Sequence, residues 1–300
     1  MKTKYYIFAL AAMTMTLGSC SDSENTTGTE APKSITVSTS IGKMTRITTD
    51  EKGAQAFSEG DEISVYAWTG SADKVPAAAE RVVNNAINKL TDKVWVATPQ
   101  MLWKNNLDKH YFIGIYPTKS VDNLTADTYT FNAENQLASD LLVAVNVKGL
   151  SYTKDAKDAV KLDFTHVMAK MVVNLTYKNQ WGGTPTVKNV VVSDAVKEAT
   201  INYLTKAVTP TTTAKADFEV PATVANTQYV SVLIPQNGIQ KLAITIGDKT
   251  FIYDNGSPFK FESGKITTIN LEVGRDQVIL DEVKISDWAE GSTFNGEAFD

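Results

Sequence analysis

The chain has 300 residues, of which 43% are hydrophobic and 21% are charged, and its formal net charge is −5 at pH 7. This composition is that of a globular protein, and the mild negative charge without a Lys/Arg cluster among aromatics argues against nucleic acid as a partner. A single cysteine excludes an internal disulfide, and no later apolar run is long enough to cross a membrane as a helix.

The beginning of the chain divides into a leader and a polar stretch. Lys2 and Lys4 precede about a dozen largely apolar residues, fewer than the roughly 20 needed to span a bilayer. Small residues then come directly before Cys20. These three features predict a signal peptide over residues 1–19. Residues 20–34 have no aromatic and almost no branched aliphatic side chain, so we expect a flexible tether there.

Cys20 stands where the mature chain is expected to begin. The sequence Leu-Gly-Ser before it, together with Cys20 itself, resembles the bacterial lipobox, in which the thiol receives a diacylglycerol. Each buried methylene contributes about 0.8 kcal/mol, so two or more acyl chains such as palmitate anchor stably. The resemblance implies lipoprotein-processing enzymes as partners and attachment to the outer membrane. Asp22 and Glu24 resemble a tract that directs some lipoproteins to the cell surface. The alternative is an ordinary signal peptide with an incidental cysteine.

Most of the mature chain has the pattern of β-strands. Residues 35–41 alternate apolar with polar side chains, which is the period of a half-buried strand. Eleven further stretches are rich in Val, Ile, Thr and aromatics and are bounded by turn residues: 63–68, 110–117, 141–147, 161–167, 170–177, 187–193, 228–235, 241–247, 250–254, 265–273 and 278–285. Only residues 77–90 have helical character. Many short strands with regular turns predict an all-β fold of β-sandwiches.

The length of the mature chain, about 280 residues, is enough for two domains. Residues 151–160 are mostly polar and show no strand pattern, so we expect a domain boundary there. This places one β-sandwich domain at 35–157 and a second at 158–300. The alternative is a long solvated loop within one domain.

No catalytic or cofactor-binding motif is present. His110 and His166 lie in strand-like segments without partners nearby in sequence, and we expect both to be structural. There is no nucleophile elbow, phosphate loop, zinc-protease motif or C-x-x-C. We therefore expect no enzyme, no cofactor and no metal. Trp95, Trp103 and Trp288 are expected to pack in the core, although exposed tryptophans could instead stack on sugar rings.

Several short segments occur in an order that spans nearly the whole mature chain. They are Met-Thr-Arg at 44–46, F-x-x-G-D-x-I-x-V-Y at 57–66, an aromatic stretch ending in Tyr-Pro at 95–117, D-L-L-x-A at 140–144, L-x-F-x-H-x-x-A-K at 162–170 and I-x-x-W-x-x-G at 285–291. Together they resemble the fimbrillin family, the type V pilins of Bacteroidetes and their lipoprotein relatives. Lys104 departs from the family pattern, which often has proline after this tryptophan.

The resemblance implies two transthyretin-like β-sandwich domains and a structural role in a fimbria at the cell surface. Members of the family are exported as lipoproteins and cut by an Arg-specific protease after an arginine that follows the first strand. A strand from the next subunit then fills the groove that the first strand leaves. On this pattern the cut falls between Arg46 and Ile47, and the partners are other fimbrial subunits, identical or homologous.

The residues themselves fit this reading. The chain has three arginines, and of these only Arg46 directly follows an N-terminal strand and precedes a polar stretch, where proteases cut. Loss of residues 35–46 would uncover a strand edge, which is a template for another strand. Residues 278–285 are a candidate donor strand, the alternative being an ordinary internal strand.

Two functions from different classes remain open at this stage. The first is a fimbrial subunit, whether stalk, anchor, accessory or tip, that serves adhesion or biofilm formation. The alternative is a monomeric surface lipoprotein that binds glycans or host proteins through aromatic side chains such as Trp68 or Trp103.

Overall fold

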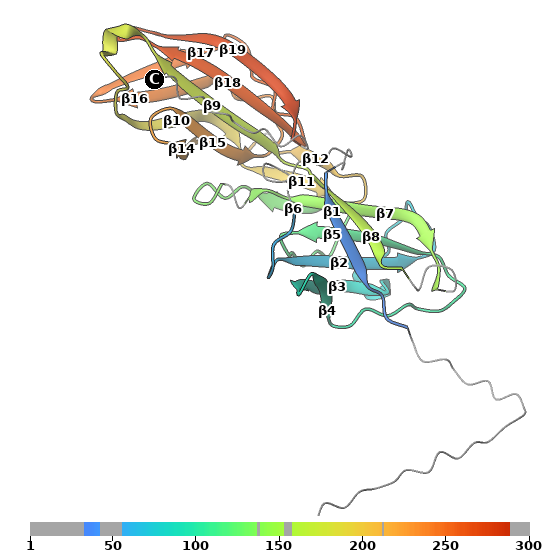
Figure 1. The fold of residues 1–300 in the computed structure, drawn as a ribbon. Coiled ribbons are helices and arrows are strands. Elements are labelled where there is room, and N and C mark those ends of the chain that lie inside the picture. The colour runs from blue at the N-terminus through green and yellow to red at the C-terminus, as the bar shows by residue number, and fades with distance from the viewer. Residues whose placement is uncertain (1–32, 43–55, 137–138, 153–157, 212, 289–300) are drawn as a thin grey trace, which may run out of the picture. The chain divides into compact units, whose positions relative to one another are not determined.

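The computed structural model describes residues 33–42, 56–136, 139–152, 158–211 and 213–288. Within these ranges the chain is built almost entirely of β-strands (Figure 1). Two single-turn 3-10 helices, η1 (Ala78–Glu80) and η3 (Asn179–Trp181), are the described helices. No helix in the described ranges has the length and apolar character to cross a membrane. The predicted all-β fold is confirmed.

The first part of the chain forms a seven-stranded sheet in the order β1-β8-β7-β5-β2-β3-β4. Its strands are β1 (Val37–Ile41), β2 (Glu62–Thr69), β3 (Val83–Thr91), β4 (Val94–Thr98), β5 (His110–Tyr116), β7 (Leu142–Leu150) and β8 (Val160–His166). All neighbours are antiparallel except β1 and β8, which run parallel.

The second part forms a four-stranded sheet and a five-stranded sheet. The first has the order β13-β10-β16-β17, and the second the order β14-β15-β9-β18-β19. Their strands are β9 (Ala169–Tyr177), β10 (Val187–Val196), β13 (Lys215–Glu219), β14 (Ala222–Val224), β15 (Gln228–Leu233), β16 (Lys241–Ile246), β17 (Lys249–Asp254), β18 (Lys265–Val273) and β19 (Val278–Asp287). A three-stranded sheet joins β6 (Asp127–Thr130) to β11 (Glu198–Asn202) and β12 (Ala207–Pro210). These sheets form two β-sandwiches in tandem.

Strand β8 belongs to the seven-stranded sheet, whereas β9 belongs to the five-stranded sheet. Strand β8 pairs with β1 and β7, although the expected division after residue 157 assigns it to the second domain. Val167 and Met168 separate it from β9, which enters the five-stranded sheet. We propose that the domain boundary lies at these two buried residues.

The prediction of helical character at 77–90 was wrong. Residues 78–80 make a single 3-10 turn, and strand β3 follows from Val83. Asn85 has φ of 59° where the pairing of β2 with β3 shifts register, so one residue of β3 bulges out of the ladder. That extra residue breaks the alternation of apolar side chains, which is why the segment does not read as a strand.

The first sheet is buried on both faces. Along β2, Ile63, Val65 and Ala67 belong to one apolar cluster, while Tyr66 and Trp68 belong to another. Because side chains alternate across a strand, the two sets lie on opposite faces of the sheet. This explains the continuous apolar run of β2, which differs from the half-buried pattern of β1.

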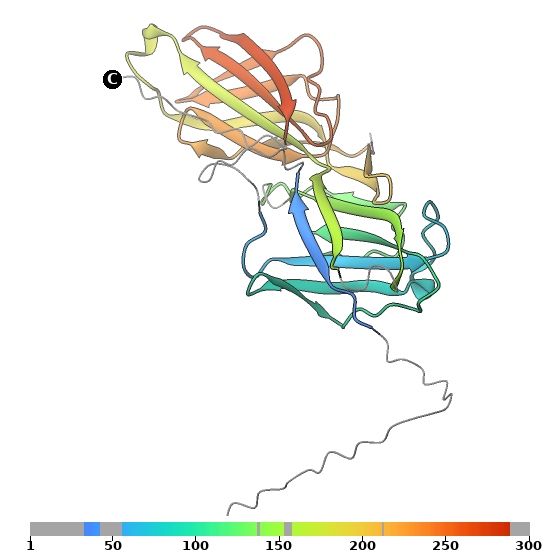
Figure 2. The same ribbon diagram turned by 45° about the vertical axis from the view of Figure 1, so that its right-hand side comes forward.

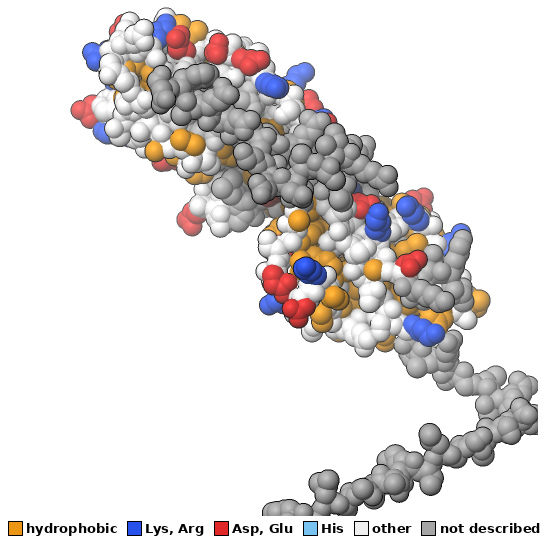
Figure 3. Space-filling model, viewed as in Figure 1, with side chains coloured by type: hydrophobic (Ala, Val, Ile, Leu, Met, Phe, Trp, Pro, Cys, Tyr) orange, Lys and Arg blue, Asp and Glu red, His pale blue; other side chains and the backbone are white. Residues whose placement is uncertain are grey.

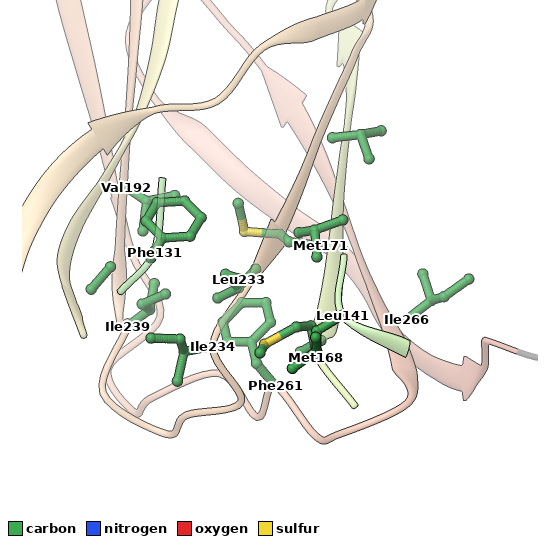
Figure 4. Packing of buried hydrophobic residues seen from close by; sticks show 14 of the residues in the cluster. Phe131, Leu141, Met168, Met171, Val192, Leu233, Ile234, Ile239, Phe261 and Ile266 are labelled. Carbon is green, nitrogen blue, oxygen red and sulfur yellow. The ribbon is translucent and has the colours of Figure 1, made fainter. Parts of the chain in front are cut away.

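The larger cluster continues into the second sandwich. Figure 4 shows Phe261 among Leu233, Ile234 and Met168, so that three separate segments of the chain meet here. Charged side chains of both signs are scattered over the face seen in Figure 3 rather than gathered into one patch. This agrees with the small net charge of the chain.

Candidate functional site

Strand β1 lies beside β8 at one end of the seven-stranded sheet (Figures 1 and 2). The two strands pair in parallel over the whole of β1, from Val37 opposite Val160 to Ile41 opposite Phe164. The Gly42 N–H extends this pairing by donating to the Phe164 carbonyl at 2.9 Å. Strand β1 therefore has a defined register against β8.

The residues just before β1 bond to a second segment, residues 101–103. The Ile35 N–H donates to the Met101 carbonyl at 2.9 Å, and the Trp103 N–H donates to the Lys33 carbonyl at 3.0 Å. The N-terminal strand is thus held on two sides, by β8 and by residues 101–103. We call these two segments, together with Trp95 and Gln100, the β1 slot.

Apolar side chains of the N-terminal strand point into the first sandwich. Ile35 is 3% exposed and Val37 is 6% exposed, and both belong to the cluster that contains Trp95, Met101 and Trp103. Full burial of such a side chain stabilises a fold by about 1.5–3 kcal/mol. Departure of this strand would expose both side chains and the apolar residues of the slot.

Phe164 shapes the floor of the β1 slot. Its ring meets the Phe57 ring edge to face, with centroids 5.2 Å apart. On strand β5, which lies beyond β7 in the sheet, a Cβ atom at Gly114 would lie 2.7 Å from the Phe164 ring, which real Cβ contacts do not allow. Glycine at 114 is therefore required for Phe164 to occupy this position.

Three polar side chains of the slot bond to hydroxyl groups of the N-terminal strand. Trp95 Nε1 donates to Thr39 Oγ1 at 3.0 Å, and Gln100 Nε2 donates to Ser34 Oγ at 2.6 Å. The Ser40 hydroxyl in turn donates to Asp163 at 2.5 Å. With the two apolar positions at 35 and 37, these bonds define what a strand must carry to fit the slot.

Strand β19, the candidate donor, lies at one end of the five-stranded sheet and pairs with β18. Val283 is opposite Ile269 and Ile285 is opposite Thr267, and both β18 residues are fully buried. Directly paired residues share a face of the sheet, so Val283 and Ile285 face inward. They are nevertheless 38% and 41% exposed. The latter half of β19 is therefore poorly covered by the second sandwich.

Trp288 packs at the end of β19. The buried Trp288 ring stacks on His166, with centroids 4.0 Å apart and an angle of 3° between the planes. Asp140 Oδ1 lies 2.8 Å from His166 Nδ1, and Lys170 Nζ lies 5.7 Å from the Trp288 ring centroid. Burial lowers the pKa of Lys170 below its usual value. Three sequence elements of the fimbrillin resemblance, at 140–144, 162–170 and 285–291, thus meet at one cluster.

His110 has a structural position, as does His166. It is fully buried, with Nε2 accepting from the Lys104 N–H and Nδ1 bonded to the Asp108 carbonyl, both at 3.1 Å. Its ring meets the edge of Trp103 at 4.9 Å. Burial lowers the pKa of His110 below 6.5, which favours the neutral imidazole that these bonds require.

Cys20, Arg46 and Ile47, the predicted lipidation and cleavage residues, lie outside the residues that the structure describes. Among the described residues, no three His, Cys, Asp or Glu side chains come together as metal ligands would. Trp68, Trp95, Trp103 and Trp288 are all buried, so the expectation that tryptophans pack in the core is confirmed for these four.

The sequence predicted the apolar alternation of the first strand but not its polar partners. Gln100 and Asp163 lie 66 and 123 residues from the hydroxyls that they bond. Nothing in the local sequence of either residue marks such a contact. The element at 285–291 was the one signal that pointed to Trp288.

The fold and the slot define a class of protein with two tandem β-sandwiches and an N-terminal strand seated at a sheet edge. A sequence profile described as fimbrillin-like matches residues 45–288. The chain belongs to this fimbrillin-like family. Comparison with curated protein sequences gives no significant match.

Solved structures of similar fold come from Bacteroides and Porphyromonas species. A protein from Bacteroides ovatus described as a cell adhesion protein has 19% identity and a TM-score of 0.66, covering 86% of this chain and 99% of its own. A similarly described protein from Bacteroides uniformis has 17% identity and a TM-score of 0.66, with coverage of 87% and 99%. The tip fimbrial protein Mfa3 from Porphyromonas gingivalis has 8% identity and a TM-score of 0.52, with coverage of 77% and 95%. At these identities the likeness concerns the fold.

Proposed function

We propose that this chain is a non-enzymatic subunit of a surface fimbria that serves adhesion or biofilm formation. Assembly proceeds when its first strand leaves the β1 slot and a strand of another subunit enters. The observation that carries this proposal is the seating of residues 33–41, which are bonded on two sides and bury Ile35 and Val37. An emptied slot would present unpaired backbone groups beside an apolar surface, which favours the addition of a strand.

The proposal includes export as a lipoprotein. Cys20 carries the lipid after lipoprotein-processing enzymes remove residues 1–19, and the chain is held at the outer membrane before assembly. An Arg-specific protease then cuts between Arg46 and Ile47. This bond follows strand β1, so cleavage there separates the seated strand from the rest of the chain.

The donor strand in this proposal is the end of β19 from another copy or a homologous subunit. Placing Val283 at the position of Ile35 and Ile285 at that of Val37 fills both apolar positions. The same register puts Glu282 in place of Ser34 and Asp287 in place of Thr39. Both carboxylates accept hydrogen bonds, as the Gln100 and Trp95 donors of the slot require.

Cleavage is tested by Arg46→Ala in cells that express the chain. We expect loss of fimbrial polymers and a lipidated chain that begins at Cys20, whereas the wild-type subunit begins at Ile47 without lipid. Arg275→Ala is the matched control because it removes another of the three arginines. Polymers of normal length from Arg46→Ala would show that cleavage at this bond is not part of assembly.

The donor register is tested separately by disulfide trapping. In the pairing of β1 with β8, Ser38 lies opposite Lys161, so the proposed register brings Ser286 of the donor to Lys161. A Ser286→Cys, Lys161→Cys chain should form cross-linked polymers, and a Ser286→Cys, Asp163→Cys chain should not. Cross-linking through Asp163→Cys alone would shift the register by two residues.

The alternative is a monomeric lipoprotein that binds glycans through Trp68 or Trp103. The structure argues against it because both tryptophans are buried. Trp68 is fully buried and its Nε1 donates to the Ser71 carbonyl at 2.8 Å. Trp103 is buried against His110 and Phe112. Neither ring presents a face on which a sugar can stack.

A further inference from the structure

Arg81 is a buried arginine between β2 and β3, with 8% of its surface exposed. Its Nε donates to the Pro76 carbonyl at 3.3 Å, and its Nη1 donates to Asn84 Oδ1 and to the Val121 carbonyl, both at 2.9 Å. Nη2 donates to the Asp122 carbonyl. All four acceptors are neutral oxygens. The side chain thus ties two loops together without meeting a negative charge directly.

Among the residues that the structure describes, no carboxylate pairs with the Arg81 guanidinium. None of the ion pairs found among the described residues includes Arg81. Burial lowers the pKa of Arg81, and the Tyr66 and Asp122 side chains oppose this effect through space. A guanidinium has five N–H groups, so one on Nη2 has no acceptor in the described part of the chain. Buried charges in proteins are ordinarily paired.

A cavity of about 470 Å³ lies beside this guanidinium. Val75, Pro76 and Leu124 contribute apolar surface to it, and Arg81 and Asp122 contribute the charged groups. Its volume falls in the range of about 300–1,000 Å³ that is usual for small-molecule sites. The residue that carries the unused N–H therefore lines the same cavity as these apolar side chains.

We propose that this cavity binds a small organic carboxylate. The carboxylate accepts the free Nη2 N–H and supplies the missing negative charge, while the rest of the molecule packs against Val75, Pro76 and Leu124. The exposed Asp122 side chain is a negative charge at the same cavity and weakens the attraction. The β1 slot is formed by other residues, so this site does not depend on strand exchange.

The carboxylate is common to sugar acids and aliphatic acids, so the experiment uses one probe of each kind with its neutral counterpart. Binding of glucuronate, glucose, isovalerate and isovaleramide to the full chain is measured by calorimetry or by ligand-observed NMR. We expect at least one acid to bind and its neutral counterpart to bind about tenfold more weakly or not at all. The acid that binds more tightly shows whether the site prefers a sugar acid or an aliphatic acid. Binding of neither acid, or equal binding of an acid and its neutral counterpart, overturns the proposal.

Two variants locate the site. Arg81→Met should reduce binding of the acid by about tenfold or more, because it removes the charged donor. Since this change can also loosen the loops that Arg81 ties, Asp122→Asn provides the second test. It removes only the opposing charge and should tighten binding by about threefold. Unchanged affinity in Asp122→Asn would mean that the acid binds elsewhere.

Discussion

Strands β1 and β19 each end a sheet, yet the two sandwiches hold them in opposite ways. The segment containing β1 is bonded on two sides and buries its inward side chains Ile35 and Val37. Strand β19 is bonded to β18 alone among the described strands, and its inward Val283 and Ile285 are well exposed. Beyond the β18 pairing, the Trp288 ring stacks on His166 and the Trp288 N–H donates to the Gly264 carbonyl at 3.0 Å.

This difference in the burial of inward side chains indicates that the β1 slot can cover apolar positions that β19 leaves exposed. A strand whose inward apolar side chains are half exposed loses little apolar burial when it leaves its sheet. It gains apolar burial when it enters a slot that covers those side chains fully. The β1 slot provides such coverage at two positions. Poor packing of β19 in its own sandwich is therefore consistent with its proposed role as donor.

The largest expected effect is on the attachment of β19. Trp288→Ala removes a buried ring and should lower the free energy of unfolding by about 3–5 kcal/mol. Hydrogen exchange along residues 278–287 should rise more than exchange along β9, because the stack is lost at the end of β19. Urea unfolding measures the loss of stability, and hydrogen exchange followed by mass spectrometry measures the change along residues 278–287.

Trp288→Phe is the matched control for this prediction. Trp288 Nε1 is a buried donor without an acceptor among the described residues, so phenylalanine keeps the stacking and removes an unsatisfied group. A loss in Trp288→Phe as large as in Trp288→Ala would contradict the view that stacking fixes the strand.

A smaller loss is expected at the other strand. Ile35→Ala should cost about 2–4 kcal/mol, because the side chain is fully buried beside Met101. Exchange should increase at residues 33–41 and at 101–103 together, since these segments bond to each other. Thr36→Ala is the control, because Thr36 is exposed on the same segment. Increased exchange in 33–41 alone would show that the two segments are not coupled.

The slot should also respond to acid. His110 has a folded pKa below its usual 6.5, so between those two values the unfolded chain binds more protons than the folded chain. Stability is therefore full above about pH 6.5 and falls as the pH drops below it. Because His110 contacts Trp103, which bonds Lys33, the loosening should include residues 33–41. Urea unfolding at several pH values checks this, and His110→Gln should flatten the dependence below pH 6.5.

The smallest effect on the isolated chain is expected at Ile285. Ile285→Ser changes a well-exposed side chain and should alter the free energy of unfolding by less than about 0.5 kcal/mol. It should nevertheless shorten the polymers formed after cleavage, because in the proposed register Ile285 takes the buried position of Val37. Normal polymers from this variant would contradict the proposed register, and Ile279→Ser is the control on the opposite face of β19.

Much of the fold was predictable because the strands carry their own signals. Each of the twelve predicted strands, from the alternation at 35–41 to the run at 278–285, overlaps an observed strand. The seven missed strands are of two kinds. Those at 94–98, 127–130, 198–202, 207–210, 215–219 and 222–224 have at most five residues, so each carries only a short pattern. Strand β3 is longer but is disguised by its bulge at Asn85.

The site was predictable only in part. Arginine and cysteine stand out in sequence because each is rare in this chain, so Arg46 and Cys20 were easy to single out. The bonds from Trp95, Gln100 and Asp163 could not be predicted, because each joins residues brought together only by the folded sheet. The buried charge of Arg81 likewise depends on which carbonyls the loops present to it.

The parallel pairing of β1 with β8 has a consequence for the order of folding. The other six strands of the sheet are joined to one another by antiparallel pairs that do not involve β1. Ser40 meets Asp163 across 123 residues of sequence, and contacts that close such long loops form late. We therefore expect the first strand of the sheet to be synthesised to be among the last to pair. If the other six strands pair with one another without β1, the sheet should also keep those pairs when β1 leaves.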